Sequence, residues 1–156
     1  IGRLPAFSPG SGIAEEPLCD DYAQIVVRNG HPLLARPDLT LADLLECPWI
    51  LPRQETSLRR QIDEGFRQMG LRPPANIVES VSILTNRALV LRADYLAVWP
   101  VQLAQFEADL GLVAALDIAL PTTHRPIGIS TRRGARLSPA AETLLGALRH
   151  AATLRV

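Results

Sequence analysis

Two hydroxyl side chains, Thr56 and Ser57, stand directly before a helical pattern, and the amide of Gln54 lies close by in the sequence. Unpaired N–H groups and the positive end of the helix dipole make such a helix start favourable for an anion. Either hydroxyl could instead cap the helix by accepting one of those N–H groups. Both roles are open from the residues alone, and the three side chains are candidate ligand contacts.

A second set of candidates lies at the ends of expected strands, where ligands gather in open α/β sheets. Arg3 ends the first strand, and its guanidinium could hold a carboxylate through two hydrogen bonds or could simply be a surface charge. Trp99 and Pro100 end a later strand, where the indole could stack on a ligand or pack between elements. Ser80 and Ser82 precede a helix as caps or ligand contacts.

The residue types that catalyse reactions or bind metals form no recognisable motif in this sequence. The three histidines lie far apart, with no Cys or carboxylate at zinc-ligand spacing. No nucleophile elbow, P-loop or dinucleotide-type glycine motif occurs, and Glu79 is a lone carboxylate near the strand ends. Cys19 and Cys47 are too few for a disulfide framework, which favours a reducing compartment. We therefore expect no catalytic residue, no metal and no cofactor.

The composition is that of a globular domain. Of the 156 residues, 47% are hydrophobic and 21% are charged, which excludes disordered and coiled-coil classes. Sixteen basic residues, all of them arginine, balance sixteen acidic ones, and this zero net charge argues against a surface built mainly for nucleic acid. No apolar run of about 18 residues is present, so we expect no membrane span and no membrane partner.

Strands and helices are expected to alternate along the chain. The β-branched and apolar runs predict strands over 22–28, 49–51, 76–79, 95–99, 112–116 with a continuation over 118–120, and 127–131. Caps and 3.6-residue periodicity predict helices over 40–45, 57–69, 82–92, 100–110 and 139–150. This alternation predicts an α/β fold with a mainly parallel sheet covered on both faces. Two long extended segments, 18–28 and 112–120, favour two lobes over one.

Eight short stretches then occur in a fixed order along the chain. They are IGRLP at 1–5, EPL at 16–18, GHPL at 30–33, LTLADL at 39–44, CPWILP at 47–52, VESVS at 78–82, ADYLAVWP at 93–100 and RRGARLSPAA at 132–141. In this order and spacing they resemble the effector-binding domain of LysR-type transcriptional regulators over nearly the whole chain. Within that family the sequence is most similar to the branch that responds to sugars and aromatic acids.

The resemblance implies a fold and a division of the chain. The fold would be two Rossmann-like α/β lobes of the type 2 periplasmic-binding-protein kind, with a ligand cleft between them. Residues 24–117 would form the second lobe, and residues 1–23 and 118–156 would form part of the first lobe. The opening elements of that incomplete lobe, and a helix-turn-helix domain, would lie upstream. A first lobe without these packing partners would leave the chain marginally stable by itself.

The resemblance also implies a function and partners. The chain would sense a small organic effector (an organic acid, an aromatic acid or a sugar) in the cytoplasm, with the loop before Thr56 holding an effector carboxylate or hydroxyl. Arg3 stands where relatives often carry a hydroxyl, which implies a more strongly anionic effector. Promoter DNA would be reached only through the upstream helix-turn-helix domain.

The resemblance further implies dimers within tetramers. The expected helix over 82–92 is apolar at Ile83, Leu84, Ala88 and Leu91 and is a candidate interface, with core packing as the alternative. Two other functions remain open on the same fold. One is an extracytoplasmic solute-binding protein, and the other is an enzyme, for which Glu79 is the lone carboxylate near the expected edge.

Overall fold

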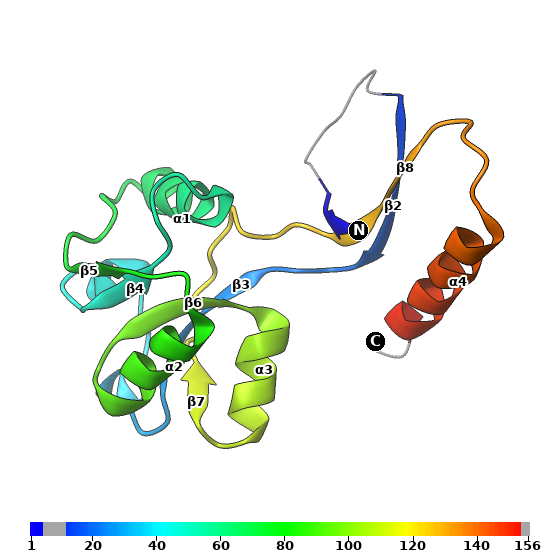
Figure 1. The fold of residues 1–156 in the computed structure, drawn as a ribbon. Coiled ribbons are helices and arrows are strands. Elements are labelled where there is room, and N and C mark those ends of the chain that lie inside the picture. Colours follow the sequence, from blue (N-terminus) through cyan, green and yellow to red (C-terminus); the bar gives the residue numbers. More distant parts are fainter. Residues whose placement is uncertain (5–11, 154–156) are drawn as a thin grey trace. The chain divides into compact units, whose positions relative to one another are not determined.

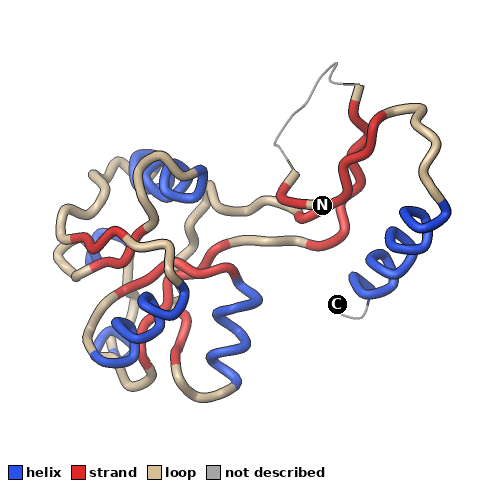
Figure 2. Tube along the Cα trace, in the orientation of Figure 1, coloured by secondary structure: helices blue, strands red, loops and turns tan. Residues whose placement is uncertain are grey.

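The computed structural model describes residues 1–4 and 12–153. The chain divides into two compact units, one formed by Ile1–Asp21 with Arg125–Val156 and the other by Tyr22–His124. We call them unit 1 and unit 2 and describe each by itself. Helices and strands alternate through unit 2, as Figures 1 and 2 show, and this confirms the predicted α/β class.

Unit 2 is built on a five-stranded mixed sheet. Its strands are β3 (Ala23–Arg28), β4 (Trp49–Leu51), β5 (Ile77–Glu79), β6 (Leu96–Pro100) and β7 (Val113–Ala115), in the order β5-β4-β6-β3-β7. Strand β4 is parallel to β5 and β6, whereas β3 is antiparallel to β6 and β7. The expectation of a mainly parallel sheet was therefore wrong. Unit 2 begins at the edge where β6 ends, with Ala23 opposite Pro100, so β3 must run the other way.

Helices cover both faces of this sheet (Figure 1). Side chains alternate along each strand, so Trp49 and Leu51 pack with α1 (Ser57–Gln68), while Ile50 packs with α2 (Ile83–Arg92) and α3 (Val101–Asp109). Two 3-10 turns, η1 (Pro32–Ala35) and η2 (Leu41–Leu44), lie between β3 and β4. The two faces of the sheet therefore pack against different helices, α1 on one face and α2 and α3 on the other.

Two local expectations for unit 2 were wrong. Residues 118–120 form no strand. The Leu116 N–H still bonds to the Ile25 carbonyl, just after β7, and the chain then leaves the sheet. The helix expected over 57–69 ends one residue early: α1 stops at Gln68, and the exposed Met69 precedes Gly70, which turns the chain with a φ of 72°.

Unit 1 has a smaller, antiparallel sheet. Its strands are β1 (Gly2–Arg3), β2 (Ile13–Cys19) and β8 (Ile127–Arg132), in the order β1-β8-β2, followed by α4 (Pro139–Thr153). Arg149 on α4 forms an ion pair with Glu16 on β2 at 2.7 Å. In the described part of the chain no helix is both long and apolar enough to cross a membrane.

Candidate functional site

Most of the sequence-predicted site residues lie along one edge of the unit 2 sheet. Because β4, β5 and β6 are parallel, their carboxyl ends meet at that edge. Each of these strand ends carries candidates: Gln54, Thr56 and Ser57 after β4, Ser80 after β5, and Trp99 and Pro100 at the end of β6. The fold therefore brings three distant stretches of sequence to the kind of edge where open α/β sheets bind ligands. We call it the carboxyl edge.

Thr56 occupies the N-cap position of α1. Its hydroxyl accepts the Arg59 N–H at 3.2 Å and donates to the Arg53 carbonyl at 2.8 Å. The side chain is half-buried, whereas Gln54 and Ser57 are exposed. Capping, one of the two predicted roles, is thus present in the structure, while the anion-binding role of these three residues stays a prediction.

The stretch after β5 also carries hydroxyl groups. Ser82 caps α2 by accepting the Thr85 N–H at 3.3 Å, so the cap is Ser82 and not Ser80. The Ser80 N–H bonds to the Leu51 carbonyl at 2.9 Å, which extends the pairing of β4 with β5 by one residue. Ser80 is held firmly at the edge as a result, and its half-buried hydroxyl accepts the Ser82 N–H at 3.2 Å.

Trp99 and Pro100 lie at the end of β6, but the indole belongs to the core. Trp99 is 3% exposed and packs with Val90 and Ala104, on the sheet face opposite α1. This placement favours the packing alternative over ligand stacking. Pro100 is half-buried and precedes α3 in the N-cap position.

Arg3 lies in unit 1, on β1. Its Nε atom bonds to Oδ2 of Asp21 at 2.5 Å, and Asp21 is almost completely buried. The second carboxylate oxygen of Asp21, Oδ1, is buried without a hydrogen-bond partner among the described residues. An effector carboxylate at Arg3 would have to compete with this ion pair, a constraint that the sequence did not reveal.

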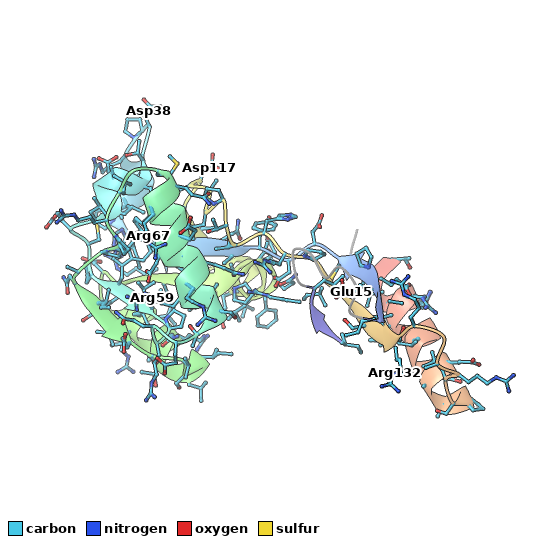
Figure 3. The ribbon with its side chains drawn as sticks, turned by 90° about the horizontal axis from the view of Figure 1, so that it is seen from above. Glu15, Asp38, Arg59, Arg67, Asp117 and Arg132 are labelled. Carbon is cyan, nitrogen blue, oxygen red and sulfur yellow. The ribbon has the colours of Figure 1, made fainter. Side chains whose placement is uncertain are left out.

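Sequence reasoning also missed Arg59. This α1 side chain, labelled in Figure 3, is 3% exposed. Its guanidinium bonds to Asp63 at 2.9 Å, to the Pro52 carbonyl at 3.1 Å and to Glu79 at 3.4 Å. It ties together the ends of β4 and β5 and the first turn of α1. The Arg–Asp spacing of four residues in a helical pattern was the one signal for it in the sequence.

Acid-base chemistry at the remaining candidates is limited. Burial raises the pKa of the Cys47 thiol, which keeps the sulfur protonated and poorly nucleophilic. Across residues 1–4 and 12–153, no three His, Cys, Asp or Glu side chains come together in a way that could hold a metal ion. The edge offers hydroxyls, an amide and a helix start, which suit the binding of a ligand better than a chemical step.

Comparisons with known proteins identify the family of this chain. The family model "LysR substrate binding domain" matches residues 1–153. The transcriptional regulator GalR of Pseudomonas putida is 35% identical over 153 residues, which cover 98% of this chain and 38% of that protein. The chain thus spans less than half the length of this curated relative.

Solved structures show the same fold. The CcmR regulatory domain of Synechocystis, solved with 2-PG, superposes with a TM-score of 0.78 at 16% identity, over 97% of this chain and 71% of that one. The BenM effector-binding domain with benzoate gives 0.71 at 20% identity, over 98% and 68% of the two chains. These domains have the type 2 periplasmic-binding-protein-like fold, as the sequence predicted. The chain therefore belongs to the LysR substrate-binding domain family of transcriptional regulators, which are not enzymes.

Proposed function

We propose that this chain is the ligand-sensing domain of a LysR-type transcription regulator, and that its effector binds at the carboxyl edge of unit 2. The match of the family model to residues 1–153 is the observation that supports this most strongly. The related domains of CcmR and BenM were solved with the small molecules 2-PG and benzoate. Residues 24–117 and residues 1–23 with 118–156 would be the two lobes of that sensor.

The residues of the edge support a small organic effector with a carboxylate or hydroxyl group. The first turn of α1 presents backbone N–H groups and a positive dipole end, next to the side chains of Gln54, Thr56 and Ser57. Ser80 would add a hydroxyl from the neighbouring strand end. Trp99 and Pro100 would support the site by fixing the end of β6. Arg3, in unit 1, would bind an effector carboxylate only by giving up its bond to Asp21.

Binding would regulate only if the effector preferred one of two conformations. A ligand with equal affinity for both would shift nothing, however tightly it bound. Promoter DNA would be contacted by a helix-turn-helix domain outside this chain, in the cytoplasm. The curated relatives are helix-turn-helix regulators, which disfavours the solute-binding alternative.

The exposed start of α2 supports self-association as a dimer or tetramer. Leu84 is 80% exposed and Ile83 is also exposed, whereas Leu91 packs partly against the core. A charge at this position, Leu84→Asp, should therefore lower the mass of the assembly in solution without unfolding the domain. Met69→Asp, at an exposed methionine just after α1, is the matched control and should leave the mass unchanged. An unchanged mass for Leu84→Asp as well would contradict this interface.

The effector site can be tested by a thermal-shift screen with benzoate, succinate and glucose as representatives of aromatic acids, dicarboxylates and sugars. We expect one class to raise the melting temperature in a concentration-dependent way. Thr56→Ala should abolish that rise, and Thr56→Ser should retain most of it, because serine keeps both the hydroxyl and the cap.

The control separates ligand binding from capping. Ser138→Ala removes a comparable cap in unit 1, where the Ser138 hydroxyl accepts the Ala141 N–H at 3.3 Å. It should lower the melting temperature of the free protein but leave the ligand-induced rise intact. A ligand-induced rise that survives in Thr56→Ala would place the effector elsewhere.

A further inference from the structure

Helix α1, whose first turn is the proposed effector contact, rests on the stretch of chain that leaves the unit 2 sheet after β7. The Thr122 hydroxyl in this stretch donates a hydrogen bond to the Gln61 carbonyl within α1. Figure 1 shows the stretch passing beside the helix. The helix that would hold an effector is therefore bonded to the segment through which the chain leaves unit 2.

The approach of this stretch to α1 is close because the helix has a glycine at the point of contact. A Cβ atom at Gly65 would lie 3.1 Å from the Thr122 hydroxyl oxygen and 3.9 Å from Cδ of Pro121. A larger residue would push Thr122 away from the helix or shift the helix itself. Glycine inside a helix is otherwise unfavourable, and the contact with Thr122 is what it provides here.

The next residue joins the same stretch to the beginning of unit 2. Thr123 is completely buried, and its hydroxyl accepts the Ala23 N–H at 3.3 Å and donates to the Leu120 carbonyl at 2.9 Å. Ala23 begins β3, just after the chain enters unit 2. We call residues 22–24 and 121–124 the connecting stretches. They are bonded to each other, and the second of them is bonded to α1.

Buried apolar side chains reinforce this arrangement. The inner face of α1 and the residues in and beside the connecting stretches share one core cluster, which includes Ile62, Phe66, Ala23 and Leu120. Close-packed side chains pass a displacement on to their neighbours, since an interior has few voids to absorb it. Helix α2 packs in the cluster on the other face of the sheet, through Val90. A movement of α1 should therefore displace the connecting stretches, whereas α2 has no such link.

We propose that the Thr122–Gly65 contact couples α1 to both connecting stretches, so that the three segments move and open as one body. A ligand that shifted α1 by binding at its first turn would shift the connecting stretches with it. It would thereby favour one of the two conformations that regulation requires. This consequence rests on the proposed effector site, whereas the coupling of α1 to the connecting stretches does not.

Amide hydrogen exchange followed by NMR tests the coupling without a ligand. Thr56→Ala removes the cap of α1, and Ser82→Ala removes the comparable cap of α2 on the other face of the sheet. If α1 and the connecting stretches open together, Thr56→Ala should lower the protection of the Ala23 N–H about fivefold, the factor that corresponds to one ordinary cap. Ser82→Ala should lower it by less than about twofold.

Variants at the contact identify the residues that carry the coupling. Thr122→Val keeps the branched side chain but removes the hydroxyl. In that background Thr56→Ala should still lower protection within α1 but should no longer affect Ala23. Thr122→Ser keeps the hydroxyl and should retain the coupling. Gly65→Ala crowds the contact from the helix side and should uncouple as Thr122→Val does, which provides a second disruption if the valine variant fails to fold.

Two results would overturn the proposal. One is an equal loss of Ala23 protection in Thr56→Ala and Ser82→Ala, because unit 2 would then open only as a whole. The other is an undiminished effect of Thr56→Ala on Ala23 in both uncoupling backgrounds. Neither result depends on the effector screen. A compound whose thermal shift requires Thr56 would still support the effector site after either result, and a flat screen would leave the coupling intact.

Discussion

Replacement of the buried Arg59 by methionine should lower the free energy of unfolding of unit 2 by more than replacement of an exposed helix residue does. Methionine keeps the apolar stem but removes every donor of the guanidinium. Asp63 and Glu79 would each lose a charged partner, and the Pro52 carbonyl would lose a hydrogen bond. The three contacts join α1, the end of β4 and the end of β5, so all three elements of the carboxyl edge would loosen together.

The magnitude follows from how buried each partner is. Removing one member of a fully buried ion pair costs about 3–5 kcal/mol. The Asp63 side chain is 17% exposed and that of Glu79 is 43% exposed, so water can rehydrate Glu79 more easily than Asp63. The loss is then dominated by the Asp63 bond and the carbonyl, and we expect about 2–3 kcal/mol.

Urea denaturation followed by tryptophan fluorescence measures this loss. Both tryptophans, Trp49 and Trp99, are buried in unit 2, so the fluorescence reports on the unfolding of this unit. Arg60→Met is the matched control on the same helix, because Arg60 is exposed and bonds to the Glu55 carbonyl at 2.7 Å. It should change stability by less than about 0.5 kcal/mol.

Two outcomes would refute the reasoning. One is a loss below about 1 kcal/mol for Arg59→Met, which would mean that the desolvation of the guanidinium offsets its three bonds. The other is an equal loss for Arg59→Met and Arg60→Met, which would mean that burial of the arginine does not matter. A double-mutant cycle with Asp63→Asn would then show which contact was overestimated.

Two further changes test unit 1 and the pH dependence. Gly128→Ala would place a Cβ 2.3 Å from the Glu16 carbonyl oxygen and 2.6 Å from Leu4, so β8 should separate from its neighbours, at a cost of at least about 1–3 kcal/mol measured by thermal melting. In η2, hydrogen bonds from Thr40 hold the pKa of Asp43 below its usual range. The ionised Asp43 carboxylate therefore stabilises the folded state above about pH 4, and this stabilisation is lost as the pH falls through the lowered pKa. Asp43→Asn should be less stable than the parent at pH 6 and lose less stability by pH 3; parallel losses would contradict this.

Local sequence determined where the helices lie, although α4 continues to Thr153, beyond the expected end at 150, and the helix expected over 40–45 is the 3-10 turn η2. Thr56 at the cap, the apolar spacing through Phe66 and the left-handed Gly70 place α1 almost residue for residue. These signals operate within about one or two helical turns, which is why a linear sequence reveals them. The alternating strand and helix patterns likewise indicated which residues would reach a carboxyl edge.

Tertiary structure alone decided how those elements were used. The face of β6 that Trp99 occupies depends on which helix covers which side of the sheet. The direction of β3 depends on the edge at which unit 2 begins. The burial of Arg59 depends on Glu79, twenty residues away, and that of Asp21 goes with a bond to Arg3. Contacts between residues far apart in the sequence leave no periodic pattern in it. They form only when the folded chain brings the two residues together, so the sequence alone does not reveal them.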